Sequence, residues 1–356
     1  MSLQEAVNKI LSQWMKGTGP DSDIVMGSRI RLARNIAKIP FPAVANDQQL
    51  SHVADLVRSS AIGNSKTDME YFGIADMPRL ERELLVEKHL MSPQQTRDVK
   101  YKAVVLRRDE LVCIMVNEED HLRIQSIYPG FQLQSAWEQC DQVDDAIGEK
   151  LEYAFSPDLG YLTACPTNVG TGLRASVMLH LPALAMTKQM QRLIPAINKL
   201  GLAVRGLYGE GTEAVGNIYQ ISNQLTLGHS EKEIVQHLAT VARQIIDQER
   251  EARQQLMQIG KAELEDRTYR ALGILSQARM ISSQEAMQLV SEVRLGVDMG
   301  LIKELDASIP KSLVVLIRPA HVQKLIGRDM DAAERDVYRA SLIREYVNIG
   351  MQEKNA

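Results

Sequence analysis

A glycine-rich turn, residues 165–176, constrains this chain more than any other feature of its sequence. It lies between two apolar segments, residues 159–164 and 177–181, which predict strands. Two glycines and an asparagine within five residues predict a tight turn, because glycine adopts backbone conformations that other residues avoid. Such a turn exposes backbone N–H groups and lets the chain approach a ligand closely. The residues that give the turn this character are Cys165, Asn168, Gly170, Gly172 and Arg174.

Arginines gather on or beside the predicted strand ends. The chain as a whole is acidic, with a formal net charge of −4, so guanidinium groups at such positions indicate a site for a polyanion. The planar guanidinium suits phosphate oxygens, and a triphosphate could engage several of these groups. A solvated strand face is the plainer interpretation of any one pair. The Walker pattern of nucleotide hydrolases, G-x-x-x-x-G-K-[ST], does not occur in the sequence. The five arginines are Arg29, Arg31, Arg123, Arg174 and Arg205.

Two acidic segments accompany the arginines. Residues 117–123 follow a predicted buried strand and contain three consecutive acids, whose carboxylates are costly to desolvate without partners. They predict either a solvated turn or a carboxylate site for a cationic ligand, and both interpretations stay open. Residues 208–213 are acidic and flanked by glycine, which predicts either a mobile flap or an ordinary surface loop.

Composition argues against several classes of protein. Only 4% of the 356 residues are aromatic and the net charge is negative, which disfavours a direct nucleic-acid partner. No apolar run approaches the ~20 residues of a membrane-spanning helix, and the N-terminus shows no signal-peptide pattern. Three cysteines make neither a disulfide framework nor a zinc site. We therefore expect a cytoplasmic protein with reduced thiols, no membrane partner and no metal site built from its own side chains.

Strand and helix patterns predict two domains. Hairpins dominate residues 103–164 without regular β-α-β alternation, which favours an α+β fold with a largely antiparallel sheet flanked by helices. Amphipathic segments such as residues 47–62 and 183–200 predict the flanking helices. The last part of the chain has a helical pattern throughout. We place a catalytic domain at residues 1–258 and an all-helical C-terminal domain at residues 259–356.

Four segments, in sequence order, resemble the signature motifs of the phosphagen (guanidino) kinases. The similarity extends from about residue 20 to about residue 258, and four motifs in register are far more specific than any one. Phosphagen kinases have a sizeable N-terminal helical domain, whereas here a short predicted helix precedes the first motif and the helical domain lies C-terminal. That arrangement resembles the bacterial protein-arginine kinases (McsB family), which phosphorylate arginine side chains within proteins. The motifs are Ser28-Arg29-Ile30-Arg31, Asn117-Glu118-Glu119-Asp120-His121-Leu122-Arg123, the segment Cys165 to Thr171, and Arg205-Gly206 with Gly209-Glu210.

The resemblance implies ATP as phosphoryl donor, Mg²⁺ as its companion ion and a guanidino group as acceptor. The five arginines match the family's phosphate-binding arginines. Glu119 and Glu210 match the two carboxylates that hold the guanidinium, and Cys165 matches the reactive cysteine. Met178 stands where phosphagen kinases often have a histidine near the nucleotide. The stretches that match the nucleotide contacts are Gly27, Ser28, Arg29, Ile30 and Arg31; His89 and Arg123; Arg174, Ala175, Ser176, Val177 and Met178; and Arg205, Gly206, Leu207, Tyr208 and Gly209.

The chemistry of guanidine agrees with these roles. A guanidinium is a poor nucleophile while it stays protonated and its lone pair is delocalised. Two carboxylates can grip its N–H groups, align one nitrogen with the γ-phosphorus and accept a proton as the bond forms. We expect Glu119 to be the base, because it follows a strand end, and Glu210 to act as a clamp on the flap. Cys165 is expected to be thiolate-like among the arginines. Mg²⁺ is expected to arrive with ATP and to reach protein carboxylates mainly through water.

A second motif lies near the C-terminus. Residues 335–340 resemble the RDxxRA motif of the bacterial protein-arginine kinases, which is associated with a regulatory phosphoarginine pocket. A charged helix face with i,i+4 spacing is the plainer interpretation of the same residues. The motif residues are Arg335, Asp336, Arg339 and Ala340.

The resemblance also implies a biological setting. It predicts a stress-response enzyme that marks proteins with exposed arginines for degradation, regulated through a dimeric C-terminal domain. The implied partners are an McsA-type activator, the ClpC–ClpP protease and the CtsR repressor. Two alternatives stay open: a phosphagen kinase for free arginine, and a non-catalytic adaptor that reads phosphoarginine. The intact set of arginines and carboxylates disfavours the adaptor.

Overall fold

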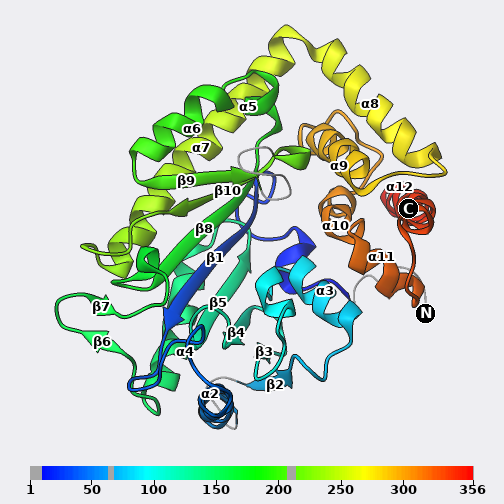
Figure 1. The fold of residues 1–356 in the computed structure, drawn as a ribbon. Helices are drawn as coiled ribbons and strands as arrows, with labels where there is room; N and C mark the ends of the chain where they lie inside the picture. The colour runs from blue at the N-terminus through cyan, green and yellow to red at the C-terminus, as the bar shows by residue number, and fades with distance from the viewer. Residues whose placement is uncertain (1–9, 63–67, 207–213, 356) are drawn as a thin grey trace.

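An antiparallel sheet forms the centre of the molecule (Figure 1). Among the described residues eight strands build it, in the order β2-β3-β4-β5-β1-β8-β10-β9, and each neighbouring pair is antiparallel. The predicted α+β fold class is therefore confirmed. The strands are β1 (Val25–Arg34), β2 (Met69–Gly73), β3 (Ala103–Arg107), β4 (Val112–Val116), β5 (Leu122–Pro129), β8 (Leu173–His180), β9 (Leu202–Gly206) and β10 (Ile218–Asn223), with a separate hairpin of β6 (Phe155–Ser156) and β7 (Gly160–Tyr161).

The structure is a computed structural model that describes residues 10–62, 68–206 and 214–355. The helix predicted over residues 1–16 lies largely outside these ranges. Leu207, Tyr208, Gly209 and Glu210, with the acidic loop to which they belong, lie outside them as well.

One face of the sheet is covered by helices from the first two thirds of the chain. Strand alternation places Ile30 and Leu32 of β1 on this face, where they are fully buried with apolar side chains of β5 and β8. A capping box begins the long helix of residues 231–259: the Ser230 hydroxyl accepts from the Glu233 N–H at 3.3 Å, and the Glu233 carboxylate accepts from the Ser230 N–H. The helices are α2 (Asp47–Ala61), α4 (Leu133–Gly148), α5 (Pro182–Met186), α6 (Met190–Lys199) and α7 (Glu231–Ile259).

The opposite face is divided between two uses. Near the start of β1 the side chains of Met26, Ile127 and Met178 join a second apolar cluster, which is shared with the C-terminal helices. These helices lie to the right of the sheet in Figure 1 and continue from α7 through the projecting α8. The other half of this face is not covered by these helices, and the arginine side chains lie there. The elements of this layer are η1 (Gln13–Lys16), α3 (Arg79–Glu87), α8 (Lys261–Gln277), α9 (Ser283–Asp298), α10 (Ser308–Leu316), α11 (Pro319–Ile326) and α12 (Ala332–Asn355).

Some predicted boundaries differ from the structure. The single helix expected over residues 183–200 is two helices, because Lys188 adopts a left-handed backbone with φ of 59° after α5. The strand expected after the glycine-rich turn begins at Leu173, within the predicted turn, and only Gly160–Tyr161 of the preceding apolar segment is strand. No helix within the described ranges is long and apolar enough to cross a bilayer.

Candidate active site

The arginines of three neighbouring strands meet on the uncovered half of the sheet. Arg29 and Arg31 share one face of β1, opposite the buried Ile30. Arg31 pairs in register with Arg174 of β8, and Arg123 of β5 stands opposite Ala33, on the other side of the same strand. These positions result from a pairing of strands far apart in the sequence, shown side by side in Figure 1.

Four guanidinium groups, those of Arg31, Arg123, Arg174 and Arg205, line a cleft of about 560 Å³, which we call the arginine cleft. Arg29 lies further along β1 and donates from Nη2 to Gln220 Oε1 at 2.7 Å. The carboxylate and thiol that the sequence predicts to react lie in the same cleft as the cations. The main polar residues of the arginine cleft are Arg31, Arg123, Arg174, Arg205, Glu118, Glu119, Ser92 and Cys165.

The cations of the cleft act on one another. Burial, followed by the charges of Arg29, Arg123 and Arg174, holds the pKa of Arg31 well below its usual value. Burial, followed by the charges of Arg205 and Arg123, likewise lowers the pKa of Arg174. Because like charges are held together at a cost, an anion with several oxygens is the ligand that this arrangement favours.

The acidic turn after β4 is tied to the arginines. Arg123 bridges two carboxylates, with Nη1 2.6 Å from Glu118 and Nη2 2.9 Å from Glu119. Glu118 is nearly inaccessible, its side chain 2% exposed, and it also accepts from the Ser92 hydroxyl, whereas the side chain of Glu119 is 38% exposed. The turn is therefore not a simple solvated one, and its role in binding a cationic ligand stays a prediction. Glu118 positions Arg123, and Glu119 faces the open cleft.

The third acid of the run joins this turn to the cysteine turn. Asp120 is fully buried, and its Oδ1 accepts from the Ala164 N–H at 2.7 Å and from Asn35 Nδ2 at 2.7 Å. The residue after Glu119 is thus bonded to the residue before Cys165, which explains why the carboxylate and the thiol reach one cleft. The Cys165 sulfur is half-buried and lies 3.0 Å from Thr167 Oγ1.

The glycines of the turn are required by close backbone contacts. Gly170 has φ of 111°, and a Cβ there would lie 2.2 Å from the carbonyl oxygen of Thr226. Gly172 has φ of 65°, and a Cβ there would lie 2.6 Å from the carbonyl oxygen of Ala33. Both conformations belong to the region that side chains disfavour. The predicted tight turn is therefore present, packed against β1 and the segment before α7.

Arg34 also supports the glycine-rich turn, through a hydrogen bond to its backbone. It is 1% exposed, lies 2.6 Å from Asp144 and donates to the Thr171 carbonyl at 2.8 Å. Its guanidinium also lies 3.5 Å from the centroid of the Tyr161 ring. Arg34 follows the predicted arginine pair in the sequence, yet its contacts are those of a buried structural residue.

The other residues predicted to bind nucleotide occupy varied positions. His89 packs against Trp14, ring centroids 5.4 Å apart, and burial with the charges of Arg29 and Arg318 holds its pKa well below the usual value. Ile30, Ala175 and Val177 point into the helix-covered core, so any contact with a nucleotide would use their backbone. The remaining predicted positions are Gly27 and Ser28 on β1, Ser176 and the buried Met178 on β8, and Gly206 at the end of β9.

The predicted regulatory motif lies on α12. Arg339 is 1% exposed and donates to the carbonyl oxygens of Ile317, at 2.7 Å, and Ile281, at 2.9 Å; it also pairs with Asp336. Arg335 is half-buried and donates to a backbone carbonyl, and Ala340 is buried. These contacts hold α12 against the loops around α9 and α10.

Sequence reasoning passed over Glu118 and Ser92. Both line the arginine cleft and contact each other. The available signal was the unbroken acidic run, but nothing in the sequence shows which of two adjacent carboxylates is buried. Side chains in an irregular turn have no fixed period, so strand alternation does not apply there.

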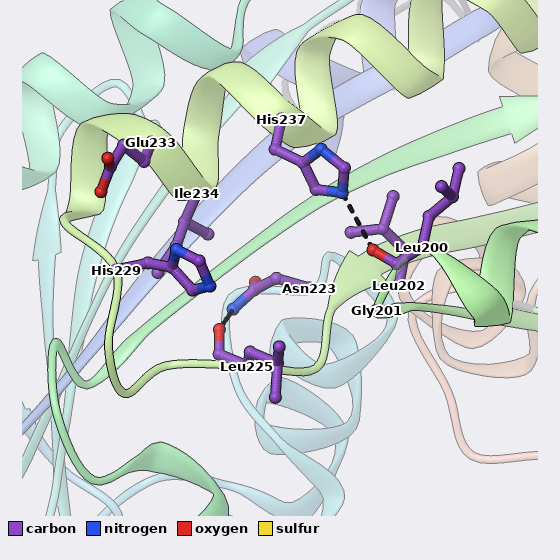
Figure 2. A pocket seen from close by; sticks show the side chains of 9 residues that line it. All are labelled: Leu200, Gly201, Leu202, Asn223, Leu225, His229, Glu233, Ile234 and His237. Carbon is purple, nitrogen blue, oxygen red and sulfur yellow. Dashed lines mark hydrogen bonds between the residues drawn. The ribbon is translucent and has the colours of Figure 1, made fainter.

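Another pocket, of about 390 Å³, lies away from the arginines between the end of α6 and the start of α7. Figure 2 shows its leucines and the imidazoles of His229 and His237. His237 donates to the Leu200 carbonyl at 2.9 Å, and Asn223 donates to the Leu225 carbonyl at 2.9 Å. These side chains maintain local structure, whereas the cationic groups suited to phosphate lie in the arginine cleft.

Comparison with known families identifies the class of enzyme. The model of the ATP:guanido phosphotransferase C-terminal catalytic domain matches residues 51–252. The crystal structure of lombricine kinase is similar, with a TM-score of 0.60, 28% identity and 71% of each chain covered. Fold, cleft and family model together define an ATP-dependent phosphotransferase of the phosphagen kinase class.

A second family model and two curated relatives identify the family within this class. The model of the protein-arginine kinase McsB C-terminal domain matches residues 261–356. The protein-arginine kinase of Halothermothrix orenii is 52% identical over 349 residues, which cover 98% of this chain and 100% of the relative. That of Bacillus subtilis is 50% identical, with 99% of this chain and 98% of the relative covered. The chain therefore belongs to the protein-arginine kinase family.

Proposed function

We propose that this chain transfers the γ-phosphoryl group of ATP to the guanidino group of arginine side chains in proteins. The observation that carries the proposal is the arginine cleft, where four guanidinium groups share about 560 Å³ with Glu119 and Cys165. The names of its relatives support a protein-bound arginine as the acceptor.

The arginines suit the donor. Guanidinium groups bind phosphate oxygens in bidentate pairs, and several of them can neutralise the charge that spreads over a phosphoryl group in transfer. The mutual repulsion of Arg31, Arg123 and Arg174 is relieved when a polyphosphate lies among them. Relief of this repulsion therefore contributes part of the free energy with which the polyphosphate binds.

Glu119 suits the acceptor. Its exposed carboxylate can accept a proton from the guanidinium while one acceptor nitrogen attacks the γ-phosphorus in line. A nitrogen–phosphorus bond forms, the bond from the γ-phosphorus to the bridging oxygen breaks, and ADP leaves with that electron pair. Phosphate oxygens compete with Glu119 for Arg123, so donor binding frees the carboxylate for the acceptor.

Mg²⁺ bound to ATP supplies further charge neutralisation. Glu118 is engaged by Arg123 and Glu119 is required by the acceptor, which fits contact with the ion through water rather than direct ligation. Cys165 lines the same cleft, where its sulfur can contact the acceptor guanidinium. We expect Cys165 to be alkylated selectively and protected by ATP with acceptor; labelling that these ligands leave unchanged would place it outside the site.

One incubation tests the reaction. The protein is mixed with Mg²⁺ and ATP labelled at the γ-phosphate, and either casein or free arginine is supplied. Acid-labile phosphate on casein is the expected result. Phosphate on free arginine alone would indicate a phosphagen kinase, and phosphate on neither acceptor would favour the adaptor that reads phosphoarginine.

The wider role is also a proposal. Kinship with the protein-arginine kinases supports a mark for regulated degradation in stress, a homodimer, and partners of the McsA, ClpC–ClpP and CtsR kinds. Residues 335–340 are the segment through which phosphoarginine is proposed to regulate the enzyme. We expect the protein to purify as a dimer together with an McsA-type partner. We expect this co-purification to be lost when residues 335–340 are changed.

A further inference from the structure

A second cleft, of about 530 Å³, adjoins the arginine cleft and shares Glu118 and Glu119 with it. We call it the acceptor cleft. One wall is the first turn of α2 with Asp47 and Leu50, and the other is the loop of residues 98–102. The two clefts therefore meet at the carboxylate expected to accept the proton.

The walls of the acceptor cleft are fixed to each other. The Asn117 side-chain amide donates to the Leu50 carbonyl at 2.9 Å and to the Tyr101 carbonyl at 2.8 Å, which ties both walls to the end of β4. At the surface, Lys100 Nζ lies 2.5 Å from Asp47 and joins the loop to α2 a second time. A binding surface held in place before its ligand arrives loses less entropy on binding.

The charge of the acceptor cleft differs from that of its neighbour. Among the residues that the structure describes, its lining contains carboxylates and lysines but no arginine. The lysines have partners within the chain, because Lys100 pairs with Asp47 and Lys102 donates to backbone carbonyls at 2.8 and 3.3 Å. The exposed Asp98 adds negative charge at the rim. A cationic acceptor is repelled by the arginine cleft and attracted here.

In-line transfer gives the same direction of approach. The acceptor nitrogen must attack the γ-phosphorus from the side opposite the leaving ADP. Glu119 borders both clefts, so with the polyphosphate among the arginines the acceptor cleft offers an approach to the γ-phosphorus from beyond Glu119.

We propose that the acceptor cleft docks the polypeptide carrying the target arginine, and that Asp98 selects a basic residue next to that arginine. This rests on the proposed function and names its substrate more closely: an exposed, basic-flanked arginine of a protein. The apolar side chains of Pro42, Ala43 and Leu50 in the lining suit the methylene groups of arginine, and the open rim suits a polypeptide.

The charge test uses Asp98→Asn. Asp98 has φ of 45°, and asparagine tolerates this left-handed backbone. Asp68→Asn is the matched control, since Asp68 is also exposed and has φ of 43°. With peptides that hold one arginine flanked by lysines or by glutamates, D98N is expected to lose about fivefold in kcat/KM on the lysine-flanked peptide, the size of an exposed ion pair. KM for ATP is expected to stay unchanged.

A steric test does not depend on charge. Ala43 is exposed and lines the mouth of the acceptor cleft, so Ala43→Trp is expected to fold and to obstruct the polypeptide. Ala262→Trp, at an exposed position of α8, is the matched control. Turnover of casein is expected to fall at least about tenfold in A43W at unchanged KM for ATP.

The outcomes separate the two proposals. If the wild type phosphorylates peptides, the ratio of kcat/KM on the lysine-flanked peptide to that on the glutamate-flanked peptide is compared between D98N and D68N. An equal ratio in the two variants overturns the role of Asp98. Casein turnover in A43W equal to that in A262W overturns docking in this cleft. If the wild type phosphorylates no acceptor, the proposed function fails, and the docking proposal fails with it.

Discussion

Glu119→Gln tests the division of labour within the acidic turn. Glutamine keeps the size of the side chain and can still accept from Arg123, but it cannot take a proton. A general base contributes about 10²–10⁴-fold, so kcat is expected to fall by that factor, equivalent to about 3–5 kcal/mol. The Glu119–Arg123 pair is 2.9 Å long and its carboxylate is 38% exposed, so its loss costs about 1 kcal/mol or less and changes KM for ATP at most about fivefold.

Glu118→Gln is the matched comparison. Its carboxylate is 2% exposed and 2.6 Å from Arg123, and breaking a buried ion pair costs about 3–5 kcal/mol. We expect E118Q to lower the melting temperature and to raise KM for ATP, because Arg123 loses its support. ADP release at varied ATP, with thermal unfolding of each variant, separates these effects. If E119Q lost ATP affinity as strongly as turnover, Glu119 would support binding rather than proton removal.

Further predictions concern the frame of the site. Gly170→Ala places a methyl group against a backbone carbonyl at positive φ, and we expect a loss of about 1–3 kcal/mol in unfolding free energy together with lost activity. Arg34→Leu leaves a buried carboxylate of α4 without its cation, which is expected to cost about 3–5 kcal/mol in chemical denaturation. Burial, followed by the charges of Arg294 and Arg253, holds the pKa of His180 well below its usual value. The unfolded chain therefore binds a proton at a higher pH than the folded chain, so this contribution to stability is complete above pH ~6.5 and is lost as the pH falls. A melting temperature that did not fall between pH 7 and pH 5, or that fell equally in His180→Gln, would contradict this assignment.

Strand alternation made half of the site predictable. The period of two residues places Arg29 and Arg31 on one face whatever the strand pairs with, and the structure has them there. The hairpin of β3 and β4 was equally predictable from the sequence, because a short loop joins two strands that pair with each other. The glycines of the turn were predictable for a similar reason, since their conformation is a local property.

Pairing between distant strands could not be read from the sequence. Arg31 and Arg174 are adjacent only because β1 lies between β5 and β8, and that order depends on the packing of the whole sheet. The contrast between Glu118 and Glu119 also depends on a local detail. Asn117 has φ of 55°, which turns the chain sharply after β4 and sends one carboxylate inward and the next outward.

The C-terminal helices were predicted as helices but not as part of the sheet's cover. Their leucine and methionine stripes show that a face is buried without showing what it packs against. In the structure they share one apolar cluster with Met26, Ile127 and Met178. The helical domain and the catalytic sheet are consequently joined through a common core.

This common core gives the C-terminal domain a physical route to the donor side of the site. Arg339 holds the Ile317 carbonyl at 2.7 Å, directly before α11. The first N–H groups of α11, with the His321 ring, donate to Glu87 at the end of α3 at 2.8–3.0 Å. Glu87 lies two residues before His89, whose pKa is lowered by burial and then by the charge of Arg29. A ligand that draws Arg339 away from Ile317 would loosen this series of contacts at its start. Because this series reaches His89 before it reaches Ser92, whose hydroxyl bonds Glu118 of the acidic turn, we expect such a ligand to act on ATP binding before it acts on proton transfer.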